Sequence, residues 1–67
     1  MTENIVVRVG QIWLERGYFR HVRVEGIEGE RVRIRTVSRD GRIVMPNTTT
    51  ARFNRFGKSY TLVVDVP

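Results

Sequence analysis

The sequence of 67 residues contains no cysteine, one histidine (His21) and a single lysine (Lys58) among its 12 basic residues. Without cysteine, no disulfide can stabilise the fold and no thiolate can bind a metal. One histidine cannot build a histidine cluster within one chain, and no phosphate-loop or dinucleotide-binding motif is present. We therefore expect neither a metal nor any other cofactor.

Long apolar runs are also missing, since none approaches the roughly 18 residues of a membrane span. The N-terminal stretch lacks the basic start and apolar run that mark a signal peptide. These absences predict a cytoplasmic protein that does not enter a membrane. Because a chain this short buries only about 60% of its unfolded surface, we expect one small domain over residues 1–67, with a flexible start at residues 1–4.

The strongest pattern that is present runs from Arg20 to Thr36. Valines alternate with polar residues in its first half, and Val32 and Ile34 alternate with arginines in its second half. This alternation predicts two strands with one apolar face and one arginine face. The residues between them predict a tight turn in which Gly29 adopts a left-handed conformation.

The register of this hairpin follows from keeping apolar residues on one face. A three-residue loop at residues 28–30 pairs Val24 with Ile34, whereas a two-residue loop at residues 28–29 mixes the faces. We also expect a bulge at Gly26, which would turn Ile27 inward.

The rest of the chain predicts shorter elements. We expect a first strand over residues 5–15 that is interrupted at Gly10, with runs at 5–9 and 11–15, and further strands at 42–45 and 60–66. Turns are expected at 16–18 and 38–41, a polar loop at 47–50 and a helical turn at 51–57. Gly17 can adopt a positive φ in the first turn, and Pro46 ends the fourth strand because it cannot donate to a ladder. Phe53 and Phe56 would share one side of the helical turn and face the core. The register of the strand at 42–45 stays open.

Five short strands with a helical turn before the last predict an all-β domain, a small five-stranded SH3-like barrel. Partial closure of the sheet would limit the exposed strand edges of so small a chain. An OB-fold is the alternative, although it would normally contain a longer helix between strands three and four.

Several short motifs between about residues 10 and 64 also resemble a known group. They are Gly10-Gln11-Ile12-Trp13, Arg20-x-Val22-x-Val24, Val32-x-Ile34-x-Thr36, Arg52-Phe53 and Tyr60-x-Leu62-Val63. Together they resemble small uncharacterised SH3-like proteins of bacteriophages and their bacterial hosts. The resemblance implies an SH3-like fold and a location in a bacterium or a phage-infected host, and it implies no catalytic residue.

The acidic residues do not suggest a catalytic pair. Glu25, Glu28 and Glu30 cluster at the predicted hairpin turn, where they would balance neighbouring arginines. His21 has no evident acid partner. We therefore expect that the protein is not an enzyme.

The excess of basic residues is the clearest functional signal, since 12 basic against 7 acidic residues give a net charge of +5. Arg31, Arg33 and Arg35 would lie about 7 Å apart on one strand face, close to the spacing of phosphates along a nucleic-acid strand. Arg20 and Arg23 would flank them on the neighbouring strand. The alternative is a solvated face on which these arginines pair with the nearby glutamates. Three further cations would extend the basic patch or only keep the helical turn soluble: Arg52, Arg55 and Lys58.

Aromatic residues gather near the first loop, which borders a ligand groove in many SH3-like folds. Exposed rings at this place could stack on bases or bind a peptide, but a small chain also needs rings in its core. Trp13 and Tyr18 fit either role, whereas we expect Phe19 in the core.

The sequence therefore predicts a module that binds DNA or RNA through phosphates without sequence specificity. The residues expected at the interface are Arg20, Arg23, Arg31, Arg33, Arg35, Trp13 and Tyr18. One alternative is a protein-interaction module, such as a phage or host regulatory or anti-defence factor that binds an acidic protein surface. Another is a small assembly component, or homo-oligomer, in which the edge strand at 60–66 pairs with another chain.

Overall fold

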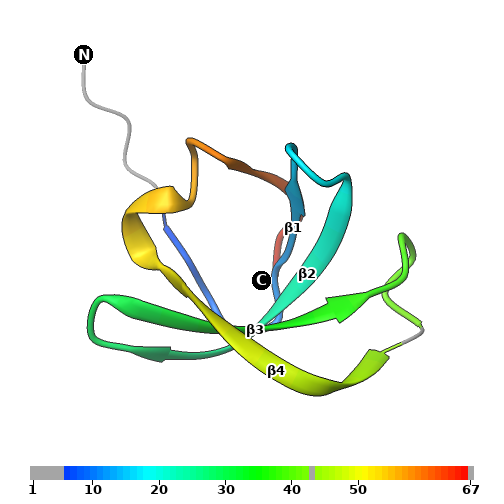
Figure 1. Ribbon diagram of the computed structural model, residues 1–67, viewed down its shortest axis with the longest axis horizontal. Helices are drawn as coiled ribbons and strands as arrows, with labels where there is room; N and C mark the ends of the chain where they lie inside the picture. The colour runs from blue at the N-terminus through cyan, green and yellow to red at the C-terminus, as the bar shows by residue number, and fades with distance from the viewer. Residues whose placement is uncertain (1–5, 43, 67) are drawn as a thin grey trace.

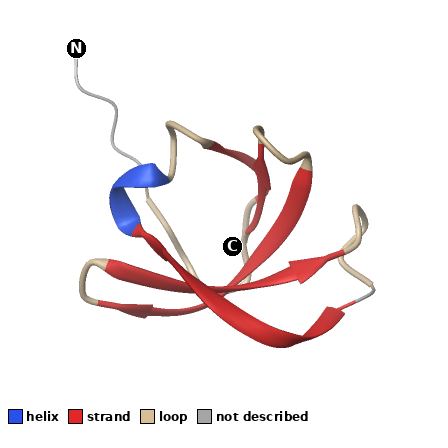
Figure 2. Ribbon diagram, in the orientation of Figure 1, coloured by secondary structure: helices blue, strands red, loops and turns tan. Residues whose placement is uncertain are grey.

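A computed structural model describes residues 6–42 and 44–66 of the chain. These residues form an all-β domain with one short helical turn (Figure 2). The elements are β1 (Ile12–Glu15), β2 (Arg20–Glu28), β3 (Arg31–Val37), β4 (Val44–Arg52), the 3₁₀ turn η1 (Phe53–Arg55) and β5 (Tyr60–Val64). The described part of the chain contains no helix that could span a membrane.

All five strands belong to one antiparallel sheet in the order β4-β3-β2-β1-β5. The sheet bends strongly at β2, so that η1 and the loop between β1 and β2 lie along the same edge of the molecule (Figure 1). The predicted five-strand layout with a helical turn before the last strand is confirmed. The predicted closure into a barrel is wrong, because no ladder in the described residues joins the outer strands β4 and β5. Among residues 6–42 and 44–66, no further strand pairs with the outer edge of β4 or of β5.

The central hairpin keeps the predicted pairing of Val24 with Ile34, but its turn differs. Glu28 pairs with Arg31, so the loop has two residues rather than the predicted three. Gly29 has a φ of 61° as expected. A bulge at Gly26, also predicted, shifts the register by one residue and makes the shorter loop compatible with the apolar face. The inward position expected for Ile27 is wrong, since it is 41% exposed.

The fourth strand is longer than predicted. Pro46 does not end it, and the threonine-rich segment expected as a loop pairs with β3. The reason is a register shift: Arg35 pairs with Thr48 and Val37 with Val44, so three residues of β4 face one of β3. Pro46 lies inside this bulge on an outer strand, where a missing N–H breaks no ladder bond. The guanidinium of Arg35 donates to the carbonyls of Met45 (3.1 Å) and Pro46 (3.2 Å) and so spans the bulge.

Two other local predictions are also wrong. Residues 6–9 form no strand, and Ile5 lies outside the described residues. In the loop at residues 16–19, Gly17 does not adopt a positive φ; Phe19 does, at 53°. The predicted turn at residues 38–41 is confirmed by a hydrogen bond from the amide of Gly41 to the carbonyl of Ser38 (2.8 Å).

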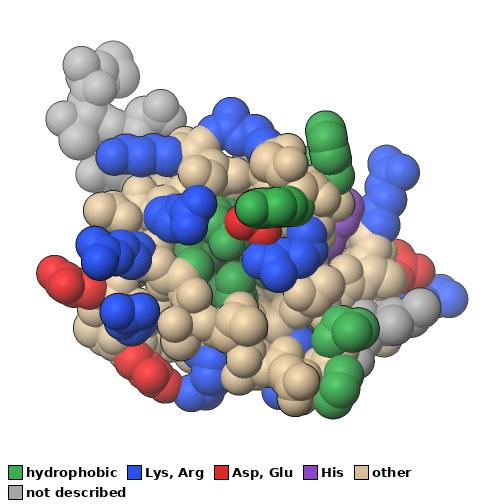
Figure 3. All heavy atoms as spheres, in the orientation of Figure 1, with side chains coloured by type: hydrophobic (Ala, Val, Ile, Leu, Met, Phe, Trp, Pro, Cys, Tyr) green, Lys and Arg blue, Asp and Glu red, His purple; other side chains and the backbone are tan. Residues whose placement is uncertain are grey.

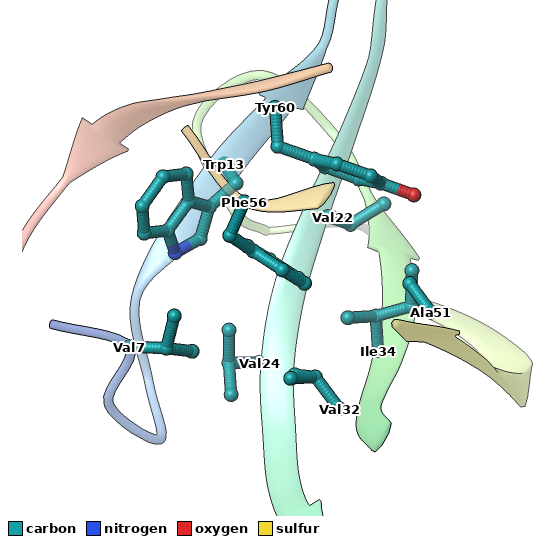
Figure 4. Packing of buried hydrophobic residues seen from close by; sticks show 9 residues of the cluster. All are labelled: Val7, Trp13, Val22, Val24, Val32, Ile34, Ala51, Phe56 and Tyr60. Atoms are coloured by element: carbon teal, nitrogen blue, oxygen red, sulfur yellow. The ribbon is translucent and has the colours of Figure 1, made fainter. Parts of the chain in front are cut away.

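The core lies on the concave side of the bent sheet (Figure 4). Phe56 is its centre: its ring meets that of Trp13 edge-on at 5.1 Å and stacks on that of Tyr60 at 4.7 Å. The sequence left the role of Trp13 open, and Trp13 is buried in the core. Phe19 was expected in the core, and this prediction is wrong, since Phe19 is 81% exposed. Phe53 was expected in the core but is 37% exposed. The remaining members of the cluster are Val7, Val22, Val24, Val32, Ile34 and Ala51.

One buried polar side chain, Gln11, joins the two ends of the described chain. Its carbonyl oxygen accepts from the amide of Arg8 (2.7 Å) and from the indole of Trp13 (3.1 Å). Its amide nitrogen donates to the carbonyl of Val6 (3.1 Å) and to the carboxylate of Asp65 (2.7 Å). Because all four positions are used, this amide can be buried without an unsatisfied group.

Candidate nucleic-acid interface

The arginine ladder predicted on β3 lies on the outer face of the sheet. Val32 and Ile34 are 0% and 2% exposed, so the residues between them point the other way. Arg31 is exposed, and Arg33 and Arg35 are half-buried. Arg23 of β2 pairs directly with Arg35, as expected from the hairpin register.

Carboxylates neutralise most of this ladder. Glu25 lies between two of its arginines, with Arg23 at 2.7 Å and Arg35 at 3.6 Å. Glu28 contacts Arg33 at 2.5 Å. The guanidinium of Arg33 lies over Gly26, where a Cβ would come within 2.7 Å of it. The predicted role of Glu25 and Glu28 in balancing arginines is thus confirmed.

Arg20 is also paired, with a carboxylate that is itself buried. Its guanidinium contacts the buried carboxylate of Glu15 at 2.7 Å. The hydroxyl of Tyr60 belongs to the same cluster: burial raises its pKa above the ordinary value, the negative charge of Glu15 adds to this, and Arg20 opposes it. Arg20 therefore pairs with a buried carboxylate between β1, β2 and β5, and its charge is balanced although its side chain is 38% exposed.

Among the predicted arginines, only Arg31 lacks an ion pair within the described residues. Four other exposed cations without an ion pair continue from it around η1. We call this set the basic rim: Arg16, Arg31, Arg52, Arg55 and Lys58.

Backbone contacts hold the basic rim together. Arg31 pairs with Arg52 across β3 and β4, and the amide of Phe53 donates to the carbonyl of Glu30 (2.7 Å). The amide of Lys58 donates to Arg55 (3.1 Å). Arg16 joins the far end through its amide, which donates to the carbonyl of Ser59 (3.0 Å). Figure 3 shows basic side chains gathered over this region of the molecule.

A shallow hollow of about 360 Å³ lies at one end of the basic rim. It is lined by Glu30, Arg31, Arg52, Phe53 and Asn54. Two guanidinium groups, an amide side chain and a partly exposed ring are the groups that a phosphate and its neighbouring base would contact. Glu30 is the one acidic residue there and has no ion pair in the described chain.

Two exposed aromatic rings lie near the other end of the basic rim. Tyr18 is 79% exposed and Phe19 is 81% exposed, both on the loop between β1 and β2. Trp13, predicted as a possible stacking ring, is 3% exposed and is not available to a ligand. Of the predicted interface, therefore, Arg31 and Tyr18 are accessible and without a carboxylate, whereas Arg20, Arg23, Arg33 and Arg35 are paired.

The alternation pattern did not reveal most of the basic rim, because its residues do not share a strand. Arg52, Arg55 and Lys58 were visible in the sequence as cations around the helical turn. These three residues lie near Arg31 and Arg16 because the sheet bends and because β4 extends to Arg52. The sequence predicted this strand only at residues 42–45. No group of three or more His, Asp or Glu side chains that could hold a metal ion occurs among residues 6–42 and 44–66.

Comparison with known proteins adds no assignment. No protein-family model matches the chain. A search of curated proteins found no match, and a search of solved structures found none. The resemblance to small phage proteins thus stays an expectation, and the function must be argued from the surface itself.

Proposed function

We propose that the protein binds nucleic acid through the basic rim and contacts its phosphates with little sequence specificity. The observation that carries this proposal is the cluster of exposed cations without ion pairs around η1, in a chain of net charge +5. Elsewhere on the sheet, glutamates neutralise the arginines. The basic rim thus holds five of the seven cations that have no ion pair in the described residues, and a polyanion gains from this cluster by binding there.

The pairing of Arg31 with Arg52 supports this proposal most directly. Like charges directly opposite each other on a sheet are destabilising. A phosphate placed between two guanidinium groups removes the repulsion and accepts charge-assisted hydrogen bonds from both. Arg55, Lys58 and Arg16 would contact further phosphates along the strand.

The proposal is tested with the double variant Arg31→Ala/Arg52→Ala. Binding of labelled DNA and RNA is measured by fluorescence anisotropy at about 50 and about 200 mM salt, the range in which phosphate contacts are most evident. We expect a loss of affinity of about tenfold or more at the lower salt. The slope of log affinity against log salt should flatten by about 1.4 to 1.8, because two phosphate contacts are lost.

The matched control is Arg39→Ala/Arg42→Ala, which removes the same charge from the turn at residues 38–41. This turn lies away from η1 (Figure 1). We expect it to retain most of the affinity. Equal losses in both variants would place the interface elsewhere, and no binding by the wild type at the lower salt would contradict the proposal. Co-purification of one acidic protein would favour the protein-interaction alternative, since the same cations attract carboxylates.

The fold class agrees with this proposal. We also propose that this open sheet is related to SH3-like domains, and its five strands with a 3₁₀ turn before β5 support the proposal. The expected location in a bacterial or phage-infected cytoplasm stays a prediction.

A second candidate, self-assembly, is supported by β5. Leu62, Val63 and Val64 are 39 to 46% exposed on an outer strand without proline or charge. Such an edge is a template for strand pairing, and the partner we propose is a second copy. Antiparallel pairing of two β5 strands brings Lys58 of one copy towards Asp65 of the other, which is favourable. Val63→Lys should convert a dimer into a monomer in sedimentation equilibrium, whereas a monomeric wild type would contradict this candidate.

A further inference from the structure

We infer that the nucleic acid bound at the basic rim is single-stranded, and that Tyr18 and Phe19 stack on its bases. This inference rests on the proposed function and specifies its ligand. It is drawn from the exposure of the two rings, the backbone conformation of Phe19 and the connection of their loop to the basic rim.

The two rings do not contribute to the core. Trp13, Phe56 and Tyr60 supply its aromatic contacts, in one edge-on and one stacked pair. Tyr18 and Phe19, by contrast, are about four-fifths exposed. Two adjacent exposed aromatic residues in so small a domain are unusual, because a ring gains its stability by burial.

The backbone at Phe19 makes its exposure more informative. Phe19 is the one non-glycine residue with a positive φ in the described chain. This conformation disfavours a bulky side chain by about 1 kcal/mol or more, whereas glycine or asparagine adopts it readily. Gly17 in the same loop could adopt a positive φ without strain, but the positive φ is at Phe19 instead. The loop therefore holds a ring in solvent at an energetic cost and with no packing in return, which is typical of a functional position.

The loop is connected to the phosphate-binding cations. The amide of Arg16 donates to Ser59, and the amide of Ser59 donates to the carbonyl of Arg55 (2.9 Å). The loop is also bonded to the end of β1, because the amide of Tyr18 donates to the carbonyl of Glu15 (3.3 Å). The rings are thus carried on the same structural unit as Arg16, Arg55 and Lys58.

This arrangement fits a single strand better than a duplex. Platforms for single strands combine a basic track for the backbone with aromatic rings on which bases stack, and each stacked base contributes about 1–3 kcal/mol. In a duplex the bases are stacked on one another and paired, so exposed rings find no free base face. Stacking is also tolerant of sequence, in agreement with a surface that has few groups placed for reading base edges.

The experiment compares four labelled probes of about 12 nucleotides, within the site sizes known for single-strand binders. They are oligo-dT, oligo-U, the dT·dA duplex and an abasic deoxyribose-phosphate strand, all at about 50 mM salt. We expect oligo-dT or oligo-U to bind at least about fivefold more tightly than the abasic strand, the effect of about 1 kcal/mol of stacking. The duplex, which offers phosphates but no free base faces, should bind less tightly than oligo-dT or oligo-U.

The variant that isolates the rings is Phe19→Asn, which suits the positive φ and keeps the charge. Its thermal midpoint should equal or exceed that of the wild type, while its preference for oligo-dT over the abasic strand falls by about fivefold. Tyr18→Asn should lower the same preference. The control is Val9→Asn, since Val9 is 58% exposed and lies outside the strands; we expect no change in binding.

The outcomes separate this inference from the proposed function. Equal binding of the abasic strand, the duplex and oligo-dT, with no effect of Phe19→Asn, would overturn single-strand stacking and leave phosphate binding in place. No binding of any probe would overturn both. A Phe19→Asn variant that loses stability as well as binding would show that the ring has a structural role, and the inference would fail.

Discussion

Arg31 of β3 lies directly opposite Arg52 of β4, and neither residue pairs with a carboxylate in the described part of the chain. On the same sheet, each of Arg23, Arg33 and Arg35 has a glutamate as a partner. The contrast locates the unneutralised charge at the end of the sheet next to η1. The local stability that these two residues lose by repulsion is recovered when an anion binds between them.

Replacement of Arg52 should change stability and binding in opposite directions. In Arg52→Glu a like-charge pair becomes an opposite-charge pair, so we expect the free energy of unfolding to rise by about 0.2–1 kcal/mol. The affinity for single-stranded DNA should fall at least tenfold. Urea denaturation and anisotropy titration measure the two effects. Arg39→Glu changes the net charge equally at the far turn and should alter neither quantity to this extent; a less stable Arg52→Glu variant would contradict the prediction.

The pair of Glu15 and Arg20 should matter far more for stability than the exposed pairs. Glu15 is 5% exposed, and its carboxylate is 2.7 Å from Arg20. Glu15→Gln removes the charge that balances a partly buried guanidinium, so we expect a loss of about 1–3 kcal/mol in urea denaturation. Glu28→Gln is the control, because the Arg33–Glu28 pair is exposed and such pairs contribute about 0–1 kcal/mol. Similar losses in both variants would show that burial does not decide the effect.

The strand positions could be predicted where the apolar pattern is strict. Val32 and Ile34 alternate with arginines, and since a buried sheet face tolerates no slip, the pairing of Val24 with Ile34 followed from the sequence. The turn did not, because a loop of two residues with a bulge at Gly26 gives the same pairing as a loop of three, and the predicted register did not count the bulge that was expected there. The end of the fourth strand at Pro46 was wrongly predicted for a similar reason. The local sequence does not distinguish a proline inside a bulge of an outer strand from a proline that ends a strand.

The interface was only partly predictable, for a different physical reason. A strand pattern shows which arginines share a face but not which of them a carboxylate neutralises. Glu25 and Glu28 could be named as partners, yet the absence of a partner at Arg31 depends on the geometry across three strands. The exposure of Phe19 was not predictable either, because composition favours a core position for a phenylalanine in a small chain.

Asp65 predicts a pH dependence of stability on the acid side. Its pKa lies below the ordinary value of 3.8, first because its carboxylate accepts a hydrogen bond from Gln11, and also because it accepts from the amide of Val66 and lies near Arg8, while desolvation opposes the shift. A lowered folded-state pKa stabilises the fold above pH 3.8, and this contribution is lost as the pH falls through the folded-state pKa. Asp65→Asn should therefore be less stable than the wild type at neutral pH.

The difference between Asp65→Asn and the wild type should shrink as the pH falls from 3.8 through the lowered folded-state pKa, below which the carboxylate is protonated in both states. Thermal midpoints measured across this range test it. Asp40 also has a lowered pKa, from hydrogen bonds of Ser38 and of the amide of Arg42. Asp40→Asn should therefore show a similar acid dependence. Gln11→Ala should weaken the acid dependence that comes from Asp65, because it removes the largest cause of the lowered pKa, and should leave the contribution of Asp40 unchanged. A pH-independent gap between Asp65→Asn and the wild type would contradict the assignment.

Replacement of Gln11 tests how much the contacts between the two ends of the described chain contribute to the stability of the fold. Gln11→Leu keeps the volume close to that of the amide but leaves the indole N–H of Trp13 and the amide of Arg8 without their acceptor. A buried donor without a partner costs about 1–3 kcal/mol, so we expect a loss of about 2–4 kcal/mol, close to the limit for so small a domain. Gln11→Glu keeps the acceptor and replaces the donor to Asp65 by a second carboxylate, so its loss of stability should depend on pH. If Gln11→Leu were as stable as the wild type, the contacts of Gln11 with Val6, Arg8 and Asp65 would contribute nothing to folding. Hydrogen exchange at the amide of Val24, which donates to the carbonyl of Gln11 at 2.9 Å, would then be unchanged.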